Sequence, residues 1–345
     1  MVAKKSKEYS SASRCNPQLT VCCYARVRDK AFFETHEFYR IDIQILRELG
    51  YHIVVTNSVI KMLMTRCDLY YAWWFGYGIF AALLGTIMRK PVIVSGVIHT
   101  PRCGGLSDWP VLKRAVFKLT MRLADCSILC SHGEYQRLEG FRPRKCEIVP
   151  LTIDSNEYCY KQETREKTIL MVTHMSLENV KRKMVLPAIK AFAAFRVKHP
   201  EFRLIVCGAT GDGMDVVRAC MRETGQDEWV TFTGRVSLKD KIALLQTAWA
   251  YLQPTSCEGF GLAIGEALAC GTPVVTSPEL CVVGTYGNAV HYGESPAEFA
   301  QCLTRLVDDA DLYKIMQHRG LLQIQKYSLA NRREHLKNII DHSFA

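Results

Sequence analysis

The sequence predicts an α/β protein with two doubly wound, Rossmann-like domains whose parallel sheets face each other across a cleft. Short apolar stretches alternate with amphipathic stretches of helical period in both halves of the chain. A polar, irregular stretch at 151–167 interrupts this alternation midway. The length of 345 residues suits two domains of ordinary size. We therefore expect an N-terminal domain over 19–150 and a C-terminal domain over 151–325.

The two ends of the chain lie outside this alternation. Residues 1–18 are rich in Ser and Lys without apolar periodicity, and we expect them to be disordered. Residues 326–345 are predicted to form a helix that returns to the N-terminal domain.

In the first half, apolar runs predict six strands, at 19–24, 51–56, 67–74, 91–98, 126–130 and 146–150. Helices are expected at 38–49, where Gly50 ends the apolar stripe, and at 110–123, with Asp108 as its cap. A third helix should open at the capping box Ser131-His-Gly-Glu134. The uncharged stretch 69–88 is long enough to span a bilayer. Its central aromatic residues and glycines favour a buried strand, a turn and a short helix instead.

The second half predicts strands at 168–172, 202–207, 229–232, 250–253 and 273–276. The intervening helices are expected at 185–198, 213–223, 238–246 and 262–269. Ligands of such domains bind beyond the carboxyl ends of the strands. With two domains, the site should therefore lie in the cleft between them.

Composition narrows the class of protein. The 15 cysteines include an adjacent pair and no Cys-x-x-Cys spacing, which disfavours a disulfide framework and a zinc site and indicates a reducing, cytoplasmic location. Of the net charge of +10, seven basic residues against one acid fall between Arg89 and Arg122. Such a patch suits phosphates or an anionic membrane surface, and a solvated face is the plain alternative. No recognised nucleic-acid module is visible, so nucleic acid is not an expected partner.

The most informative segment runs from Pro254 to Pro273, where a strand, a glycine-bearing loop and a helix follow one another. Gly259 and Gly261 allow the backbone to approach a ligand closely. Amides at the start of the helix favour an anion such as a diphosphate. Glu266, inside the helix, can accept hydrogen bonds from vicinal ribose hydroxyls, and Glu258, in the loop, from a second sugar. These residues predict a site for a nucleotide sugar.

This segment resembles glycosyltransferase family four, the retaining glycosyl transferases group one of the GT-B fold. Two glutamates with seven residues between them, in Glu258-Gly-Phe-Gly-Leu-Ala-Ile-Gly-Glu266, precede Gly271-Thr-Pro-Val-Val275 as they do in that family. The segment Arg182-Lys183-Met-Val-Leu-Pro resembles its basic motif. The likeness extends from Val21 onward and is strongest in the second half.

The resemblance implies a role for each matching residue. Glu266 would bind the ribose, Glu258 the transferred sugar, and Lys183 the diphosphate as it leaves. The remaining donor-binding positions would be the backbone of Gly259, Phe260, Gly261 and Leu262, the side chains of Arg182 and His174, and the segment Arg235–Val236 near the base. His99, after the predicted strand 91–98, would lie near the donor sugar and orient it or move a proton.

Two positions depart from the family's pattern. His174 stands where the family has an arginine, so either His174 or a neighbour such as Arg182 must supply that charge. The glycine pair after the first strand is replaced by Ala25-Arg-Val-Arg-Asp-Lys30.

The resulting hypothesis is a retaining hexosyltransferase that takes a nucleotide-diphosphate sugar as co-substrate, with a glycan, glycolipid or lipid-linked sugar as acceptor. No cofactor or metal is expected, and the acids Asp308, Asp309 and Asp311 fit a solvated helix surface. Two alternatives remain open: a GT-B-fold nucleotide-sugar epimerase or hydrolase, and a non-catalytic nucleotide-sugar-binding protein. The location is expected to be cytoplasmic, with the membrane surface as one option, because 110–123 has the pattern of an interfacial helix.

Overall fold

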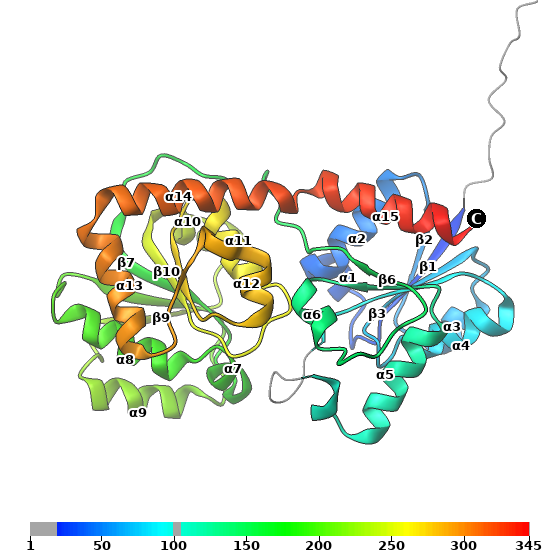
Figure 1. Cartoon of the computed structure of the whole chain (residues 1–345), viewed down its shortest axis with the longest axis horizontal. Coiled ribbons are helices and arrows are strands. Elements are labelled where there is room, and N and C mark those ends of the chain that lie inside the picture. The colour runs from blue at the N-terminus through cyan, green and yellow to red at the C-terminus, as the bar shows by residue number, and fades with distance from the viewer. Residues whose placement is uncertain (1–18, 99–104, 345) are drawn as a thin grey trace, which may run out of the picture.

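Two parallel sheets form the centres of two domains in the computed structural model, which describes residues 19–98 and 105–344. Both sheets have six strands, in the orders β2-β1-β3-β4-β5-β6 and β12-β11-β10-β7-β8-β9. Every pairing in both sheets is parallel, so each strand is followed by a crossover. The two domains lie side by side (Figure 1). The predicted fold class is confirmed.

The N-terminal domain contains the strands β1 (Thr20–Tyr24), β2 (His52–Thr56), β3 (Leu69–Trp73), β4 (Val92–Ser95), β5 (Cys126–Leu129) and β6 (Cys146–Ile148). Its helices are α1 (Phe32–Thr35), α2 (Glu37–Glu48), α3 (Val59–Met64), α4 (Ile79–Met88), α5 (Val111–Leu123) and α6 (His132–Gln136). Helices α3, α4 and α5 share one apolar core on one face of the sheet, and α2 shares another core on the opposite face. The stretch 69–88 therefore forms a strand and a short helix, as predicted.

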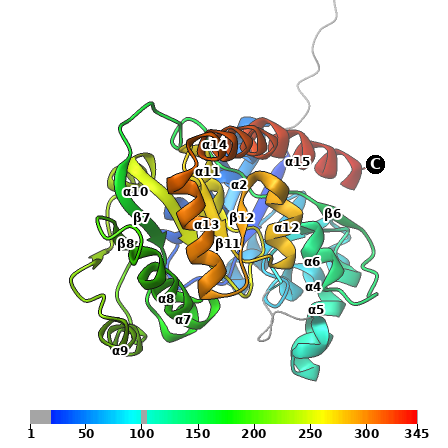
Figure 2. The ribbon, with the colours of Figure 1, turned by 60° about the vertical axis from the view of Figure 1, so that its left-hand side comes forward.

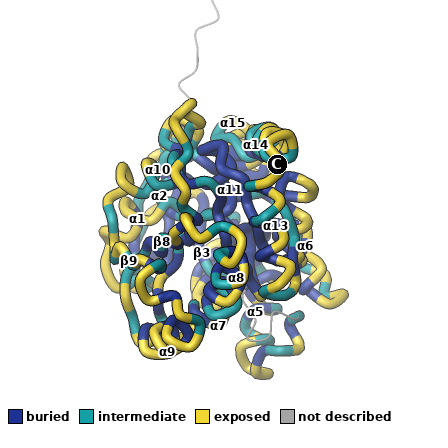
Figure 3. The backbone as a smooth tube through the Cα atoms, turned by 90° about the vertical axis from the view of Figure 1, so that its left-hand side faces the viewer, coloured by how far each residue is buried: buried dark blue, intermediate teal, exposed yellow. Residues whose placement is uncertain are grey.

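The C-terminal domain contains β7 (Glu166–Val172), β8 (Arg203–Cys207), β9 (Val230–Gly234), β10 (Ala248–Gln253), β11 (Val274–Thr276) and β12 (His291–Tyr292). Its helices are α7 (Leu177–Arg182), α8 (Val185–Arg196), α9 (Met214–Thr224), α10 (Leu238–Thr247), α11 (Leu262–Ala269), α12 (Leu280–Tyr286), α13 (Pro296–Asp308) and α14 (Ala310–Ile324). Helix α11 is largely buried, whereas α9 exposes most of its surface (Figure 3).

The C-terminal segment runs from one domain to the other. Helix α14 lies over the C-terminal domain, and α15 (Leu329–Ser343) lies over the N-terminal domain (Figures 1 and 2). A buried ion pair fixes α15 to α2, because Arg332 Nε donates to Asp42 Oδ1 at 2.7 Å. Tyr71 Oη also donates to this carboxylate, at 2.8 Å.

Two local predictions need correction. Asp108 does not cap α5: it belongs to a short 3₁₀ turn (Leu106–Asp108), and Pro110 occupies the cap position without a side-chain hydrogen bond. The Ser131–Glu134 capping box is only half formed. Ser131 Oγ accepts the Glu134 N–H at 3.3 Å, but the Glu134 carboxylate accepts the N–H groups of Ile98 and Cys130, both at 2.7 Å.

No helix within 19–98 and 105–344 combines the length and the apolar content that crossing a membrane would require.

Candidate active site

The predicted donor-binding residues gather at one edge of the C-terminal sheet. His174 follows β7, Arg235 and Val236 follow β9, and the loop 254–261 follows β10. Because the strands are parallel, their carboxyl ends meet at the same edge. This edge faces the N-terminal domain: a Cβ atom on Gly259 would lie 2.2 Å from Cγ1 of Val97, which follows β4. The glycine therefore permits close contact between the domains.

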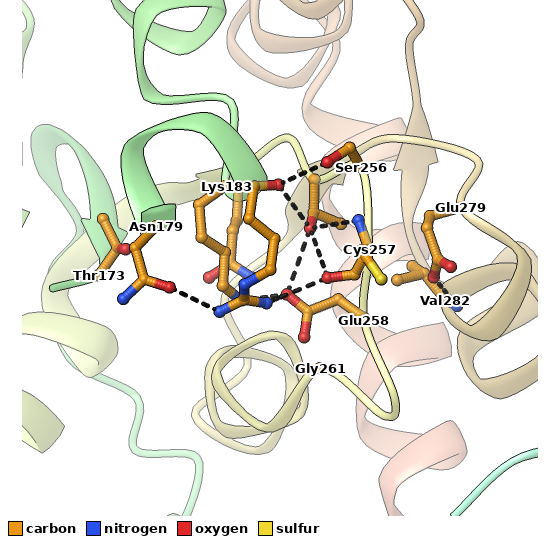
Figure 4. A network of polar contacts seen from close by, with 12 residues as sticks. Thr173, Asn179, Lys183, Ser256, Cys257, Glu258, Gly261, Glu279 and Val282 are labelled. Carbon is orange, nitrogen blue, oxygen red and sulfur yellow. Dashed lines mark hydrogen bonds and ion pairs between the residues drawn. The ribbon is translucent and has the colours of Figure 1, made fainter. Parts of the chain in front are cut away.

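The Glu258 carboxylate is buried among cationic groups. Its side chain is 8% exposed, and its Oε1 accepts a hydrogen bond from the Lys183 ammonium, with which it forms an ion pair. Arg182 Nη1 and Thr255 Oγ1 approach the same oxygen, each at 3.3 Å (Figure 4). Burial lowers the pKa of Lys183, and the negative charge of Glu258 opposes that shift. One acid and two cations thus share a site from which water is largely excluded.

A short helix positions these cations. Ser176 Oγ accepts the Asn179 N–H and so caps α7, which ends at Arg182, and Lys183 follows as its C-cap. Arg182 is held in place further by Asn179, whose Oδ1 accepts from Nη2 at 2.9 Å. No helix is predicted over 177–182 from the sequence, although Ser176 three residues before Asn179 is a capping signal.

The start of α11 presents unused backbone donors. Gly261 is the N-cap with φ +82°, a left-handed conformation that favours glycine. The Phe260 ring packs against Tyr286 and Tyr327, with centroids 5.8 and 5.1 Å away. The N–H groups of Phe260, Gly261 and Leu262 donate to no acceptor among the residues that the structure describes. The loop is therefore fixed by its aromatic ring, while its amides stay available for an anion.

Glu266 lies one turn further along α11 and is 5% exposed. Lys241, on α10, donates to both carboxylate oxygens, at 3.0 and 3.1 Å. Glu37, at the start of α2, lies close enough to Glu266 to feel its charge. Its Oε1 accepts a hydrogen bond from the Tyr158 hydroxyl at 3.2 Å. Burial, and next the charge of Glu266, raise the pKa of Glu37. Neither Lys241 nor Glu37 was identified from the sequence, because only the fold brings them to Glu266.

An open pocket of about 740 Å³ lies beside this group. One wall consists of Glu34–Phe38 and Arg40 from the N-terminal domain. The other wall contains Val236, Lys241 and Leu262 from the C-terminal domain. Two of the predicted donor-binding residues thus line an interdomain cleft. Arg235 precedes Val236 and is exposed to solvent.

Arg137 joins the two domains behind the Glu258 loop. Its Nη1 donates to the carbonyl oxygens of Ile98, at 3.1 Å, and Glu258, at 2.9 Å. Its Nη2 pairs with Glu279, whose carboxylate also accepts the N–H groups that open α12. Arg137 and Glu279 side chains are 2% and 5% exposed. One buried guanidinium of the N-terminal domain therefore holds the backbone of the loop 254–261, which no sequence motif indicated.

The remaining predicted residues lie apart from the cluster of Glu258, Lys183 and Arg182, or outside the residues that the structure describes. His174 is exposed, and its Nδ1 accepts the N–H of Ser176 at 3.0 Å, so the imidazole stabilises its own turn. His99 lies outside the described residues, as does the stretch 1–18. Of the three acids near α14, Asp309 caps this helix by accepting the Leu312 N–H. Within the described ranges, no group of three or more His, Cys, Asp or Glu side chains could hold a metal ion.

The sequence is similar to those of known glycosyltransferases. Residues 159–321 match the family described as Glycosyl transferases group 1. The O-antigen chain mannosyltransferase B of Escherichia coli is 34% identical over 141 residues, which cover 39% of this chain and 35% of that protein. A D-inositol 3-phosphate glycosyltransferase of Corynebacterium jeikeium (strain K411) is 26% identical over 259 residues, or 68% of this chain and 61% of the relative. The matched parts therefore span about a third to three fifths of these two relatives.

The solved structures extend the likeness to both domains. Anabaena Alr3699/HepE, in complex with UDP and glucose, superposes with a TM-score of 0.76 at 17% identity. The superposition covers 94% of this chain and 100% of that chain. At this identity the likeness establishes the fold, which is the GT-B arrangement of two Rossmann-like domains.

Proposed function

We propose that the protein transfers a sugar from a nucleotide-diphosphate sugar to an acceptor hydroxyl, because residues 159–321 match the family of glycosyl transferases group 1. One observation carries the proposal. Two buried acids, Glu258 and Glu266, flank the unused N–H groups of 260–262, and each acid is paired with a lysine. Hydroxyl acceptors on both sides of an anion-binding helix start suit a sugar, a diphosphate and a ribose in that order.

In the proposed reaction, Glu266 binds the ribose hydroxyls and Lys241 holds its carboxylate in place. Glu258 binds hydroxyls of the sugar, and the diphosphate takes over the positive charge of Lys183 and Arg182. The bond between the anomeric carbon and the phosphate oxygen breaks with its electron pair on that oxygen. The acceptor oxygen bonds to the same face of the anomeric carbon, and its proton passes to the leaving phosphate oxygen.

Two finer features belong to the same proposal. Retention is proposed from the resemblance to a retaining family, and because no nucleophile for a double displacement is assigned, the front-face route is proposed by analogy. Two cationic side chains and three amides can stabilise the leaving diphosphate, so the proposed reaction requires no metal. The Anabaena structure contains UDP, which makes UDP-sugars the first donors to test.

A thermal-shift panel of UDP-, GDP-, ADP- and dTDP-sugars tests the proposal. A ligand at a hundred times its Kd stabilises the folded protein by about 2.7 kcal/mol, enough to raise the melting temperature measurably. We expect one nucleotide class to raise it and the matching free sugar to leave it unchanged. Transfer is then measured with the radiolabelled donor and a set of acceptor alcohols. A panel without any shift would contradict the proposal, and release of free sugar or an epimer alone would replace transfer by another reaction.

A further inference from the structure

The outer surface of the N-terminal domain carries an unusual number of exposed apolar side chains. Of the 23 large hydrophobic side chains that are exposed in the described part of the chain, ten lie on helices α3, α4 and α5. They are Ile60, Leu63, Met64, Phe80, Leu83, Ile87, Met88, Val111, Leu112 and Leu119. Met64, Leu112 and Ile87 are 79%, 77% and 74% exposed. By comparison, α14 exposes only two such side chains along its whole length.

The helices that carry these side chains lie beside one another, and we call their outer surface the α3–α5 face. The three helices cover the same side of the N-terminal sheet, where their inner residues share one core. Helix α4 contacts α3 on one side and α5 on the other (Figure 1). On α4, Phe80, Leu83 and Ile87 are spaced three and four residues apart, so they form a single stripe opposite the core.

The charged side chains on the three helices of the α3–α5 face all have one sign, and Asp125, two residues beyond α5, is paired with Arg144 at 2.8 Å. The sequences of α3, α4 and α5 contain no Asp or Glu. Eight basic residues lie on these helices or within two residues of them: Lys61, Arg66, Arg89, Lys90, Lys113, Arg114, Lys118 and Arg122. Within 19–98 and 105–344, none of the eight forms an ion pair with a carboxylate.

Aromatic rings position several of these cations. The Lys113 ammonium lies 4.3 Å from the centre of the Trp109 ring, and Lys118 and Arg122 both lie 5.3 Å from that of Phe141. These contacts leave the positive charges in place, because a ring face attracts a cation without neutralising it. Arg114 and Lys118 act electrostatically on the Glu139 carboxylate, which accepts hydrogen bonds from Ser107.

From this combination we infer that the α3–α5 face binds an anionic lipid bilayer. Exposed apolar side chains can enter the region between head groups and acyl chains, while long basic side chains reach the phosphates. A second copy of the chain is a poorer occupant, because a two-fold interface would bring the same unneutralised bases against each other. The inference stands without the proposed function. If both hold, the acceptor-side domain would work at a lipid surface.

Co-sedimentation of the full-length protein with vesicles tests the inference. We expect binding to phosphatidylcholine vesicles that contain phosphatidylglycerol, weak binding to pure phosphatidylcholine, and release at high salt. Lys61→Gln and Lys113→Gln should each lower the partition coefficient about fivefold, as one cation near an anionic surface does. The apolar variant Met64→Ser/Ile87→Ser/Leu112→Ser should lower it at least as much.

Matched control variants distinguish binding through the α3–α5 face from non-specific adsorption of exposed apolar side chains to vesicles. Ile315→Ser and Leu322→Ser on α14 remove apolar side chains of 47% and 49% exposure and should leave vesicle binding unchanged. Circular dichroism melting of every variant should match the wild type, since all altered side chains are exposed. Lack of binding to the anionic vesicles, or equal losses in the α14 controls, would overturn the inference. So would a dimer in sedimentation velocity without lipid that the apolar variant dissociates, because the face would then join two copies.

Discussion

Replacement of Lys183 by alanine tests the role proposed for this lysine in stabilising the leaving diphosphate. In the free protein, Glu258 would keep Arg182 and Thr255 as partners at 3.3 Å. The carboxylate is therefore not left alone, and the loss in stability should stay below the 3–5 kcal/mol typical of breaking a buried ion pair. The rate should fall further. If Lys183 neutralises the leaving diphosphate, its loss resembles the removal of one oxyanion-hole donor, which lowers kcat by about 10²–10³.

The assay is the initial rate of sugar transfer with the donor that the thermal-shift panel identifies. Lys181→Ala serves as the matched control, because Lys181 lies on the same helix and is exposed to solvent. Lys181→Ala should retain the wild-type kcat. A Lys183→Ala enzyme within tenfold of the wild-type kcat would refute the assigned role, and so would an equal loss in the control.

Three further predictions concern the buried charges that hold the domains. Arg137→Met removes the partner of Glu279 and should lower the free energy of unfolding by about 3–5 kcal/mol in urea titrations, whereas Glu279→Gln, which keeps the helix cap, should cost less. Arg332→Leu should cost a similar amount by isolating Asp42, and adding Asp42→Asn should restore part of it; no restoration would argue against the pair. Burial raises the pKa of Glu134 from 4.5 to about 7, so its stabilising contribution is present below pH 4.5 and is lost as the pH rises through 7. Urea titrations at pH 5 and pH 8 should show most of this loss, about 2–3 kcal/mol, in the wild type and not in Glu134→Gln; parallel curves would contradict the shift.

The sequence was sufficient for the fold because both halves repeat one local pattern. Apolar runs such as 168–172 and 202–207 became neighbouring strands β7 and β8, with boundaries shifted by at most two residues. Helix α11 begins and ends where its pattern predicted, since Gly261 and the apolar residues after it leave little choice. The short elements α7, α12 and β12 were missed, because so few residues carry little periodic signal.

The site was only partly accessible from the sequence. Glu258, Glu266 and Lys183 lie in a contiguous motif, and the structure does bring Glu258 and Lys183 into contact. Arg137 and Lys241 could not be found in this way, because each acts on a residue far away in the chain: 121 and 25 positions separate them from Glu258 and Glu266. The role of Arg137 depends on how the two domains face each other, and that of Lys241 on how α10 packs beside α11. No local pattern encodes either arrangement.

Binding of a nucleoside diphosphate and of its 2′,3′-dideoxy analogue to wild type and Glu266→Ala, by isothermal titration, tests the central claim most directly. Hydrogen bonds from ribose hydroxyls to a buried carboxylate contribute about 1.5–3 kcal/mol, so the wild type should bind the dideoxy analogue roughly ten- to a hundredfold more weakly. Glu266→Ala should bind both compounds with the same, weaker affinity. If the variant still discriminates between them as the wild type does, the ribose lies elsewhere and the donor does not occupy α11.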